Sequence, residues 1–227
     1  PEKPNVTSVE LTENLRMLGG ADVKSVAPTG NRKFGGLAAL GDKLYLSPWD
    51  TDKLLEFDPA TGAIRGYDVR AVARCSHKFV GMVALGDKLY AAPNNSDKLL
   101  EFDPATCAIR GYDVTTLART HSKFGCPVAL GGKLYAAPCG SDQLLEFDPA
   151  TGAIRGYGVT AVASGQTKFA DLAALGGKLY AAPLSSNKLL EFDPATGAVR
   201  GYDVTAVASG PHKFWGIVAF GGKLYAA

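Results

Sequence analysis

Short apolar stretches alternate with turn-forming residues along most of the chain. Within residues 78–122 the apolar stretches are 79–85, 89–92, 99–103 and 108–114. Gly-Asp-Lys, a polar Asn-rich loop and Asp-Pro-Ala-Thr separate them in turn. Short apolar runs broken by Gly, Pro and Asn are typical of β-strands joined by tight turns, and no stretch has helical periodicity. The pattern predicts four antiparallel strands in two successive hairpins.

This unit repeats along the chain. Lys-Leu-Tyr begins at residues 43, 88, 133, 178 and 223, each 45 residues after the last. Residues 78–122 and 123–167 share 30 of 45 positions, which indicates recent duplication of one unit. We therefore expect one domain over residues 1–227, built from units at 33–77, 78–122, 123–167 and 168–212 and from a partial unit beginning at 213.

Four short strands per unit, at a spacing typical of propeller blades, predict an all-β fold: a five-bladed β-propeller of four-stranded antiparallel blades. We name the strands of a blade A to D from the central channel outward. Pro127 falls in strand A of its unit, and an innermost strand is an edge that tolerates proline. In the C–D turn Gly62, Gly152 and Gly197 suit a left-handed position. Cys107 at the same place should cost about 1 kcal/mol of strain if it keeps that conformation.

The fifth blade lacks its outer strands at the C-terminus. Five A and five B strands are present, but only four C and four D strands follow them. Val9-Glu10-Leu11 resembles the Leu-Glu-Phe of strand C, and residues 20–23 resemble the Gly-Tyr-Asp-Val of strand D. We expect N-terminal strands C and D, at about 5–23, to pair with C-terminal strands A and B at 213–227, which removes two sheet edges.

The segments Lys-Leu-Tyr-Ala-Ala-Pro and Leu-Leu-Glu-Phe-Asp-Pro-Ala-Thr-Gly resemble blades of YVTN/NHL-type and quinoprotein-like propellers, and of recently amplified algal propellers. The resemblance covers about residues 5 to 227. It implies the propeller fold, and it says little about function because such folds carry lectins, lactonases, hydrolases and scaffolds.

Composition narrows the choice of partners. The net charge is +2, from 24 basic and 22 acidic residues, which lacks the basic excess expected of a nucleic-acid binder. No apolar run approaches the length of a membrane helix. Four cysteines are too few for a disulfide scaffold, which favours a reducing, intracellular compartment, and Cys126 and Cys139 are expected as reduced thiols. We expect a monomer without a cofactor.

No catalytic or metal constellation is evident. Opposite-strand pairing should place Glu56 across from Arg65 in a surface ion pair that recurs in the next three blades. The fourth strand A positions, where a propeller enzyme would gather metal ligands, hold one carboxylate, Asp171. His77, His121 and His212 fall in separate D–A loops with no ligand spacing. We expect no enzyme activity and no metal.

Variation between repeats is concentrated on one face of the ring. The B–C and D–A loops differ from blade to blade, whereas the A–B and C–D turns hardly change. Two explanations remain open. The geometry of the A–B and C–D turns restricts the sequence of their face, the constant face, and leaves the other free to drift, or the other face, the variable face, binds a ligand. Trp49 with its neighbour Asp50, and Trp215, lie on this face in blades one and five and could stack a sugar or anchor a protein partner.

A lysine opens strand A in every blade, next to a phenylalanine. These lysines are Lys33, Lys78, Lys123, Lys168 and Lys213. By symmetry they should ring one mouth of the channel and could bind a small anion such as sulfate, phosphate or a carboxylate. The alternative is that each stem covers the neighbouring Phe while its ammonium group stays in water.

The sequence therefore predicts a non-enzymatic binding or protein-interaction module that uses the variable B–C and D–A face. The alternative is a lectin-like binder of glycans or other small molecules, with a lactonase or hydrolase in third place. The sequence does not identify the ligand.

Overall fold

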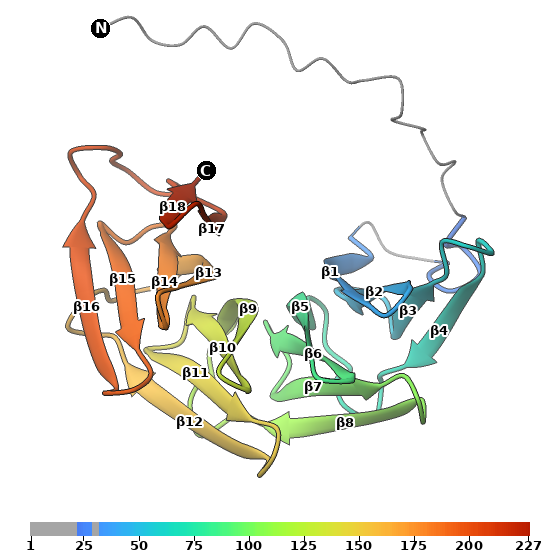
Figure 1. The fold of residues 1–227 in the computed structure, drawn as a ribbon. Helices are drawn as coiled ribbons and strands as arrows, with labels where there is room; N and C mark the ends of the chain where they lie inside the picture. Colours follow the sequence, from blue (N-terminus) through green and yellow to red (C-terminus); the bar gives the residue numbers. More distant parts are fainter. Residues whose placement is uncertain (1–21, 29–31) are drawn as a thin grey trace, which may run out of the picture.

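The computed structural model describes residues 22–28 and 32–227 (Figure 1). In these residues it contains strands, turns and loops but no helix, and so no helix that could span a membrane. The first blade comprises β1 (Phe34–Leu40), β2 (Lys43–Pro48), β3 (Lys53–Phe57) and β4 (Ile64–Asp68). The second comprises β5 (Phe79–Leu85), β6 (Lys88–Pro93), β7 (Lys98–Asp103) and β8 (Ala108–Asp113).

The remaining strands repeat this arrangement. The third blade comprises β9 (Phe124–Leu130), β10 (Lys133–Pro138), β11 (Gln143–Asp148) and β12 (Ala153–Gly158). The fourth comprises β13 (Phe169–Leu175), β14 (Lys178–Pro183), β15 (Lys188–Asp193) and β16 (Ala198–Asp203). The fifth contains β17 (Ile217–Phe220) and β18 (Lys223–Ala226).

Each complete blade is an antiparallel meander in chain order, and the blades are arranged around a centre lined by the A strands β1, β5, β9, β13 and β17 (Figure 1). The predicted all-β propeller of four-stranded blades is confirmed. Pro127 lies in β9, the innermost strand of its blade, as predicted.

The turns on the constant face depend on residues with special backbone conformations. In the C–D turn Asp58 accepts hydrogen bonds from the backbone N–H groups of Ala60 and Thr61, and Gly62 closes the turn at φ 72°. Cys107 occupies the same position in blade two at φ 59°, so the left-handed conformation is kept there. A side chain at this φ is strained, so the sequence of this face is restricted by its turns.

The inner strands approach one another closely. A Cβ atom added to Gly36 would lie 2.4 Å from the Cα of Gly81 in the next blade, so glycine is required there. Each complete A–B hairpin also has a register irregularity in strand A. In blade three it lies between the pairs Ala136–Pro127 and Pro138–Phe124. A regular ladder would have paired Cys126 with Ala137, and the irregularity interrupts that pairing.

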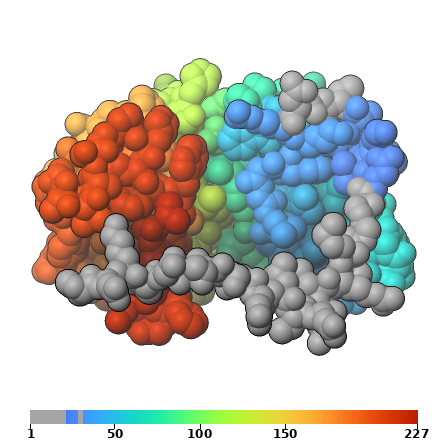
Figure 2. All heavy atoms as spheres, turned by 90° about the horizontal axis from the view of Figure 1, so that it is seen from above, coloured from blue at the N-terminus to red at the C-terminus, as the bar shows by residue number. Residues whose placement is uncertain are grey.

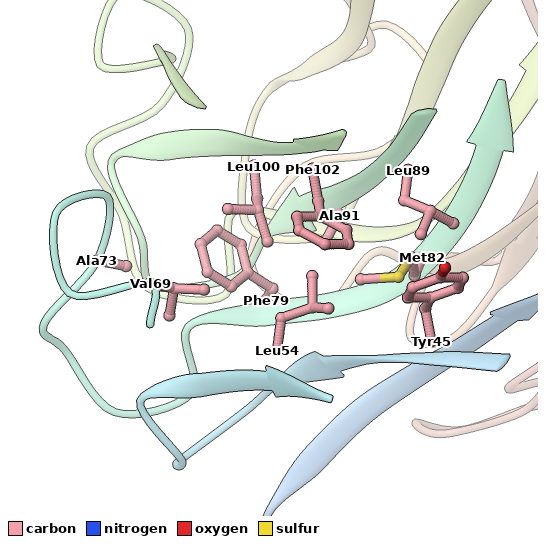
Figure 3. Packing of buried hydrophobic residues seen from close by; sticks show 10 residues of the cluster. All are labelled: Tyr45, Leu54, Val69, Ala73, Phe79, Met82, Leu89, Ala91, Leu100 and Phe102. Carbon is pink, nitrogen blue, oxygen red and sulfur yellow. The ribbon is translucent and has the colours of Figure 1, made fainter. Parts of the chain in front are cut away.

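The core lies between neighbouring blades rather than inside one of them (Figure 3). Tyr45 and Tyr67 of blade one pack on Phe102 of blade two, with ring centroids 5.9 and 4.5 Å apart. The same arrangement joins blade two to three around Phe147 and blade three to four around Phe192. Aromatic pairs at such distances add about 0.5–1.5 kcal/mol each beyond area burial. Each blade therefore needs its neighbour to bury its tyrosines.

The strand C glutamates have a different partner from the one expected. Glu56 does pair in register with Arg65, but Arg65 is exposed and the ion pair is formed instead with Lys43, at 2.7 Å. Tyr67 donates a second hydrogen bond, at 2.7 Å. Lys43 and Tyr67 are diagonal neighbours of the buried carboxylate, and their side chains reach it from either side. The same lysine contact recurs in the other three complete blades.

Most of the segment predicted to complete blade five, residues 5–21, lies outside the described residues. The residues that follow have the conformation that ends every strand D. The Val23 carbonyl accepts hydrogen bonds from the N–H groups of Val26 and Ala27, as the Val69 carbonyl does from those of Val72 and Ala73. Val26 packs against Gly66 as Val72 packs against Gly111. Residues 22–27 therefore occupy the place of a D–A loop preceding blade one, which fits the predicted closure.

Blade five, by contrast, leaves apolar side chains uncovered. Leu37 is 58% exposed in β1, whereas Met82 at the equivalent position of β5 is 7% exposed. Val218, Phe220 and Tyr225 of blade five are also exposed. The first and fifth blades face each other across an opening in the described residues (Figure 2).

Candidate functional site

The strand A lysines do not form a ring of solvated ammonium groups. The side chains of Lys78, Lys123 and Lys168 are only 2%, 4% and 1% exposed. Each reaches back to the B–C loop of the preceding blade and forms an ion pair with its aspartate: Lys78 with Asp52, Lys123 with Asp97 and Lys168 with Asp142, at 3.1 to 3.2 Å. These lysines join blades, and we call the contact the lysine bridge.

Lys213 forms a weaker version of this bridge. Asn187 stands where the earlier blades have aspartate, and its Oδ1 lies 3.5 Å from the Lys213 Nζ. The Nζ also donates to the carbonyl of Gly210 at 2.6 Å. Both partners are neutral, so the charge of Lys213 has no carboxylate partner among the described residues. Lys33 in blade one is half-buried.

Backbone hydrogen bonds fix the first residue of each B–C loop whatever its side chain. The N–H of Trp49 donates to the carbonyl of Lys33, and its own carbonyl accepts from the N–H of Lys78 in the next blade. Asn94 and Leu184 are held in the same way, and the carbonyl of Cys139 accepts from Lys168. The side chain at this position can therefore change without loss of the backbone frame.

One cavity of about 300 Å³ is lined mainly by side chains from variable positions of the repeat. Three positions of the repeat supply most of its lining: the first B–C loop residue, the residue before the strand A lysine, and the second residue of strand A or its neighbours. The lining residues are Arg32, Trp49, Val80, Asn94, Ser122, Phe124, Gly125, Cys126, Cys139, Thr167, Ala170, Leu184, His212 and Trp215. The cavity thus joins all five blades at the centre of the variable face.

Trp49 and Trp215, predicted from sequence as candidates, both line this cavity. The Trp49 indole covers Gly35 and lies 5.1 Å from the His77 ring, while Trp215 is 65% exposed and stacks on His212 at 6.0 Å with an interplanar angle of 13°. Asp50 is not in the lining. Its carboxylate accepts the backbone N–H of His77, so it holds the next blade's loop.

Several rim residues have a backbone conformation that is unusual for their type. His77, Ser122, Thr167 and His212 precede the strand A lysines at φ values between 50 and 56°. A left-handed φ is uncommon outside glycine, especially for β-branched threonine, and costs of order 1 kcal/mol or more. Three of these residues line the cavity, so their side chains are held at its rim by a strained turn.

The buried thiols of Cys126 and Cys139 are poorly suited to nucleophilic chemistry. Burial raises the pKa of the Cys126 thiol to about 12, and the Asp171 carboxylate adds to the rise. Burial also raises the pKa of Cys139. Asp171 accepts the backbone N–H groups of Leu172 and Ile217. All four cysteines are free thiols, and no group of three metal-binding side chains occurs in residues 22–28 and 32–227.

No protein-family model matches the chain, and no curated protein matches it in sequence. Solved structures do match. Virginiamycin B lyase from Staphylococcus aureus aligns with a TM-score of 0.71 and 13% identity, over 87% of this chain and 64% of its own. A streptogramin B lyase aligns with a TM-score of 0.68 and 16% identity, over 85% of this chain and 61% of its own. The chain is a β-propeller of repeated blades.

A third match extends the range of similar proteins. The extracellular domain of a protein named as a hybrid two component system from B. thetaiotaomicron aligns at a TM-score of 0.65 and 17% identity, over 86% of this chain and 26% of its own. This chain spans less than two thirds of the length of each of these structures. At such identities the likeness shows the propeller fold alone.

Sequence reasoning located the face but not all the residues of the cavity. Arg32, Ser122 and Thr167 were not among the candidates, although each precedes a strand A lysine in a variable loop. Plotting variation between repeats position by position would have found them. The strand A lysines were expected at the channel mouth because they are constant in every repeat. A constant residue in a repeat does not show which neighbouring blade it contacts.

Proposed function

We propose that this chain is a non-enzymatic binding module whose ligand occupies the cavity on the variable face. The observation that carries the proposal is that one cavity is lined mainly by side chains from positions at which near-identical repeats differ. Exposed loop positions outside the cavity, such as Arg74 and Ser76, also differ between blades, so variation marks the face and the shared cavity marks the site within it.

The lining has the composition of a small-molecule site. Apolar and aromatic side chains dominate, and Asn94, Ser122, Thr167, His212 and Arg32 supply the few polar groups. Ligand sites of about 300–1,000 Å³ usually combine an apolar lining with a few polar groups that fix orientation. This cavity is at the lower end of that range, which favours a ligand of one or two rings over a protein segment. The backbone bonds and lysine bridges hold the lining rigid, which lowers the entropic cost of binding.

A glycan-binding function is the second candidate, and the observation in its favour is the exposed Trp215 beside His212. An aromatic face of this kind stacks on a sugar ring. An enzymatic function, as in the lyases of similar fold, has less support. The thiol pKa values are raised, so Cys126 and Cys139 are poor nucleophiles, and the carboxylate of Asp171 is engaged by two backbone N–H groups.

The experiment is a thermal-shift screen of small molecules and free glycans on the wild type and Trp215→Gly in parallel. Glycine is found at this position in blades one and three, so the variant should fold. Compounds that raise the melting temperature of the wild type but not of the variant would support the cavity. Stabilisation by free sugars alone would favour the lectin. Hits that stabilise both proteins equally would place binding elsewhere and contradict the proposal.

A further inference from the structure

The cavity carries an imbalance of charge. Of its lining residues Arg32 alone has a permanent charge, and none has a carboxylate. Asp171, the acid closest to it along strand A of blade four, directs its carboxylate to the N–H groups of Leu172 and Ile217. Asp50, beside Trp49 in sequence, is engaged by the N–H of His77. Neither carboxylate is part of the lining, and both accept backbone hydrogen bonds.

A second positive charge lies at the blade-five side. In blades one to three an aspartate of the B–C loop neutralises the lysine of the next strand A. Asn187 replaces that aspartate in blade four, so the ammonium group of Lys213 has only neutral partners. Lys213 immediately follows His212 and is two residues before Trp215, both of which line the cavity. Its unneutralised charge adds a positive potential on this side.

The aromatic surface of the cavity is on the same side. Trp215 is 65% exposed and stacks on His212, so one face of this pair is open for contact. Trp49 lines the cavity from blade one, where Arg32 is also located. The aromatic groups and the positive charges therefore come from blades one and five.

We infer that the cavity selects aromatic anions, that is, ligands of one or two fused rings that carry a carboxylate or sulfonate. The inference rests on the proposed function. The ring of the ligand contacts Trp215 and Trp49. Its anionic group lies towards Arg32, where the charge of Lys213 adds to the positive potential. A neutral ligand with the same rings makes the aromatic contacts only. A small inorganic anion has the electrostatic attraction only.

Two fluorescent probes separate these contributions: 8-anilinonaphthalene-1-sulfonate and N-phenyl-1-naphthylamine, which has the same rings without the sulfonate. We expect the anionic probe to bind at least about tenfold more tightly, the effect of one charge-assisted contact in a partly desolvated site. Added salt should weaken binding of the anionic probe and leave binding of the neutral probe unchanged, because salt screens the attraction between charges.

Three variants locate the effect. Arg32→Gln should weaken binding of the anionic probe by about fivefold, and Asn187→Asp by about twofold. Neither should change binding of the neutral probe. Asn187→Asp copies the residue of blades one to three, so it should keep the protein folded. Phe220→Leu copies the residue of every other blade and removes an exposed aromatic group from the edge of blade five, so it is the control for probe bound outside the cavity.

The outcomes distinguish the two proposals. If Trp215→Gly weakens both probes equally and the two bind the wild type with the same affinity, the cavity is a binding site but the preference for anions is wrong. If neither probe depends on Trp215, the cavity does not bind such ligands, and both the inference and the aromatic site on which it rests are overturned. Loss of binding in Phe220→Leu would assign the probes to the blade edge and contradict both.

Discussion

The junction between blades two and three differs from the junctions around blade five. At the former, Tyr90 and Tyr112 pack on Phe147, and Lys123 is buried in its bridge to Asp97. At the latter, Asn187 replaces the aspartate, Tyr202 is exposed, and Trp215 stands where other blades have small residues or valine. The residues that repeat hold the fold together. Two departures from the repeat, Asn187 and Trp215, lie in or beside the residues of the cavity, where they change its charge and shape.

The largest expected effect comes from the edge of blade five. Deletion of residues 1–24 should leave β18 without a partner strand and keep its apolar neighbours exposed. An unpaired strand edge promotes association, so we expect dimers or aggregates in size-exclusion chromatography with light scattering. A soluble, monomeric truncation with an unchanged melting temperature would show that the N-terminal segment does not close the ring.

The lysine bridges should differ in the same way as the junctions. Lys123→Ala removes a buried stem and two polar contacts, and we expect it to lower the free energy of unfolding by about 2 kcal/mol or more in urea denaturation. Lys213→Ala, at the junction without the aspartate, should cost less than about 1 kcal/mol. Equal losses in the two variants would mean that the aspartate and the burial do not matter.

Acid should weaken blades one and three through their buried glutamates. Burial alone would raise the pKa of Glu56 and Glu146, but hydrogen bonds from Lys43 and Tyr67, or Lys133 and Tyr157, outweigh it and the pKa falls below 4.5. A carboxyl group with a lower pKa when folded stabilises the protein above its unfolded-state pKa. The free energy of unfolding should therefore fall as the pH drops from about 4.5 through the folded-state values.

The measurement is a series of urea titrations between neutral pH and the acid transition, for the wild type and the Glu56→Gln, Glu146→Gln double variant. The variant should be less stable at neutral pH and lose less stability on acidification. If both proteins show the same pH dependence, these carboxylates are not responsible for it.

The smallest effect comes from a departure from the repeat that lies away from the cavity. Cys107 is held at φ 59° in a turn where blades one, three and four have glycine. Cys107→Gly should raise the free energy of unfolding by about 1 kcal/mol and leave probe binding unchanged. Gly152→Cys, which places the same residue in blade three, is the matched control and should destabilise by a similar amount. A loss of stability in Cys107→Gly would contradict the strain.

The repeat made the fold predictable, because one period fixes the strands, the turn residues and the order of strands within a blade. Pro127 and Cys107 could be placed from their position in the period alone. The side-chain contacts could not. Lys78 meets an aspartate from the preceding blade, and within blade one Glu56 meets a diagonal lysine rather than the opposite arginine. The first contact depends on the angle between sheets and the second on side-chain direction, and the spacing encodes neither.

The cavity was predictable only in part for the same reason. The variable face followed from the loop sequences, and Trp49 and Trp215 from their rarity. The side chains of Ser122, Thr167 and His212 reach the rim because these residues have a left-handed φ. The sequence does not indicate this conformation, since none of the three positions holds a glycine.

The most direct test of the binding cavity uses the two tryptophans themselves, since the chain contains only Trp49 and Trp215. In protein labelled with 5-fluorotryptophan, each gives one fluorine NMR signal, and Trp215→Gly assigns them by removing one. On titration with 8-anilinonaphthalene-1-sulfonate both signals should shift with the same dissociation constant, because the two indoles line one cavity. If the probe binds while neither signal moves, or the two report different dissociation constants, the variable residues do not form one ligand site.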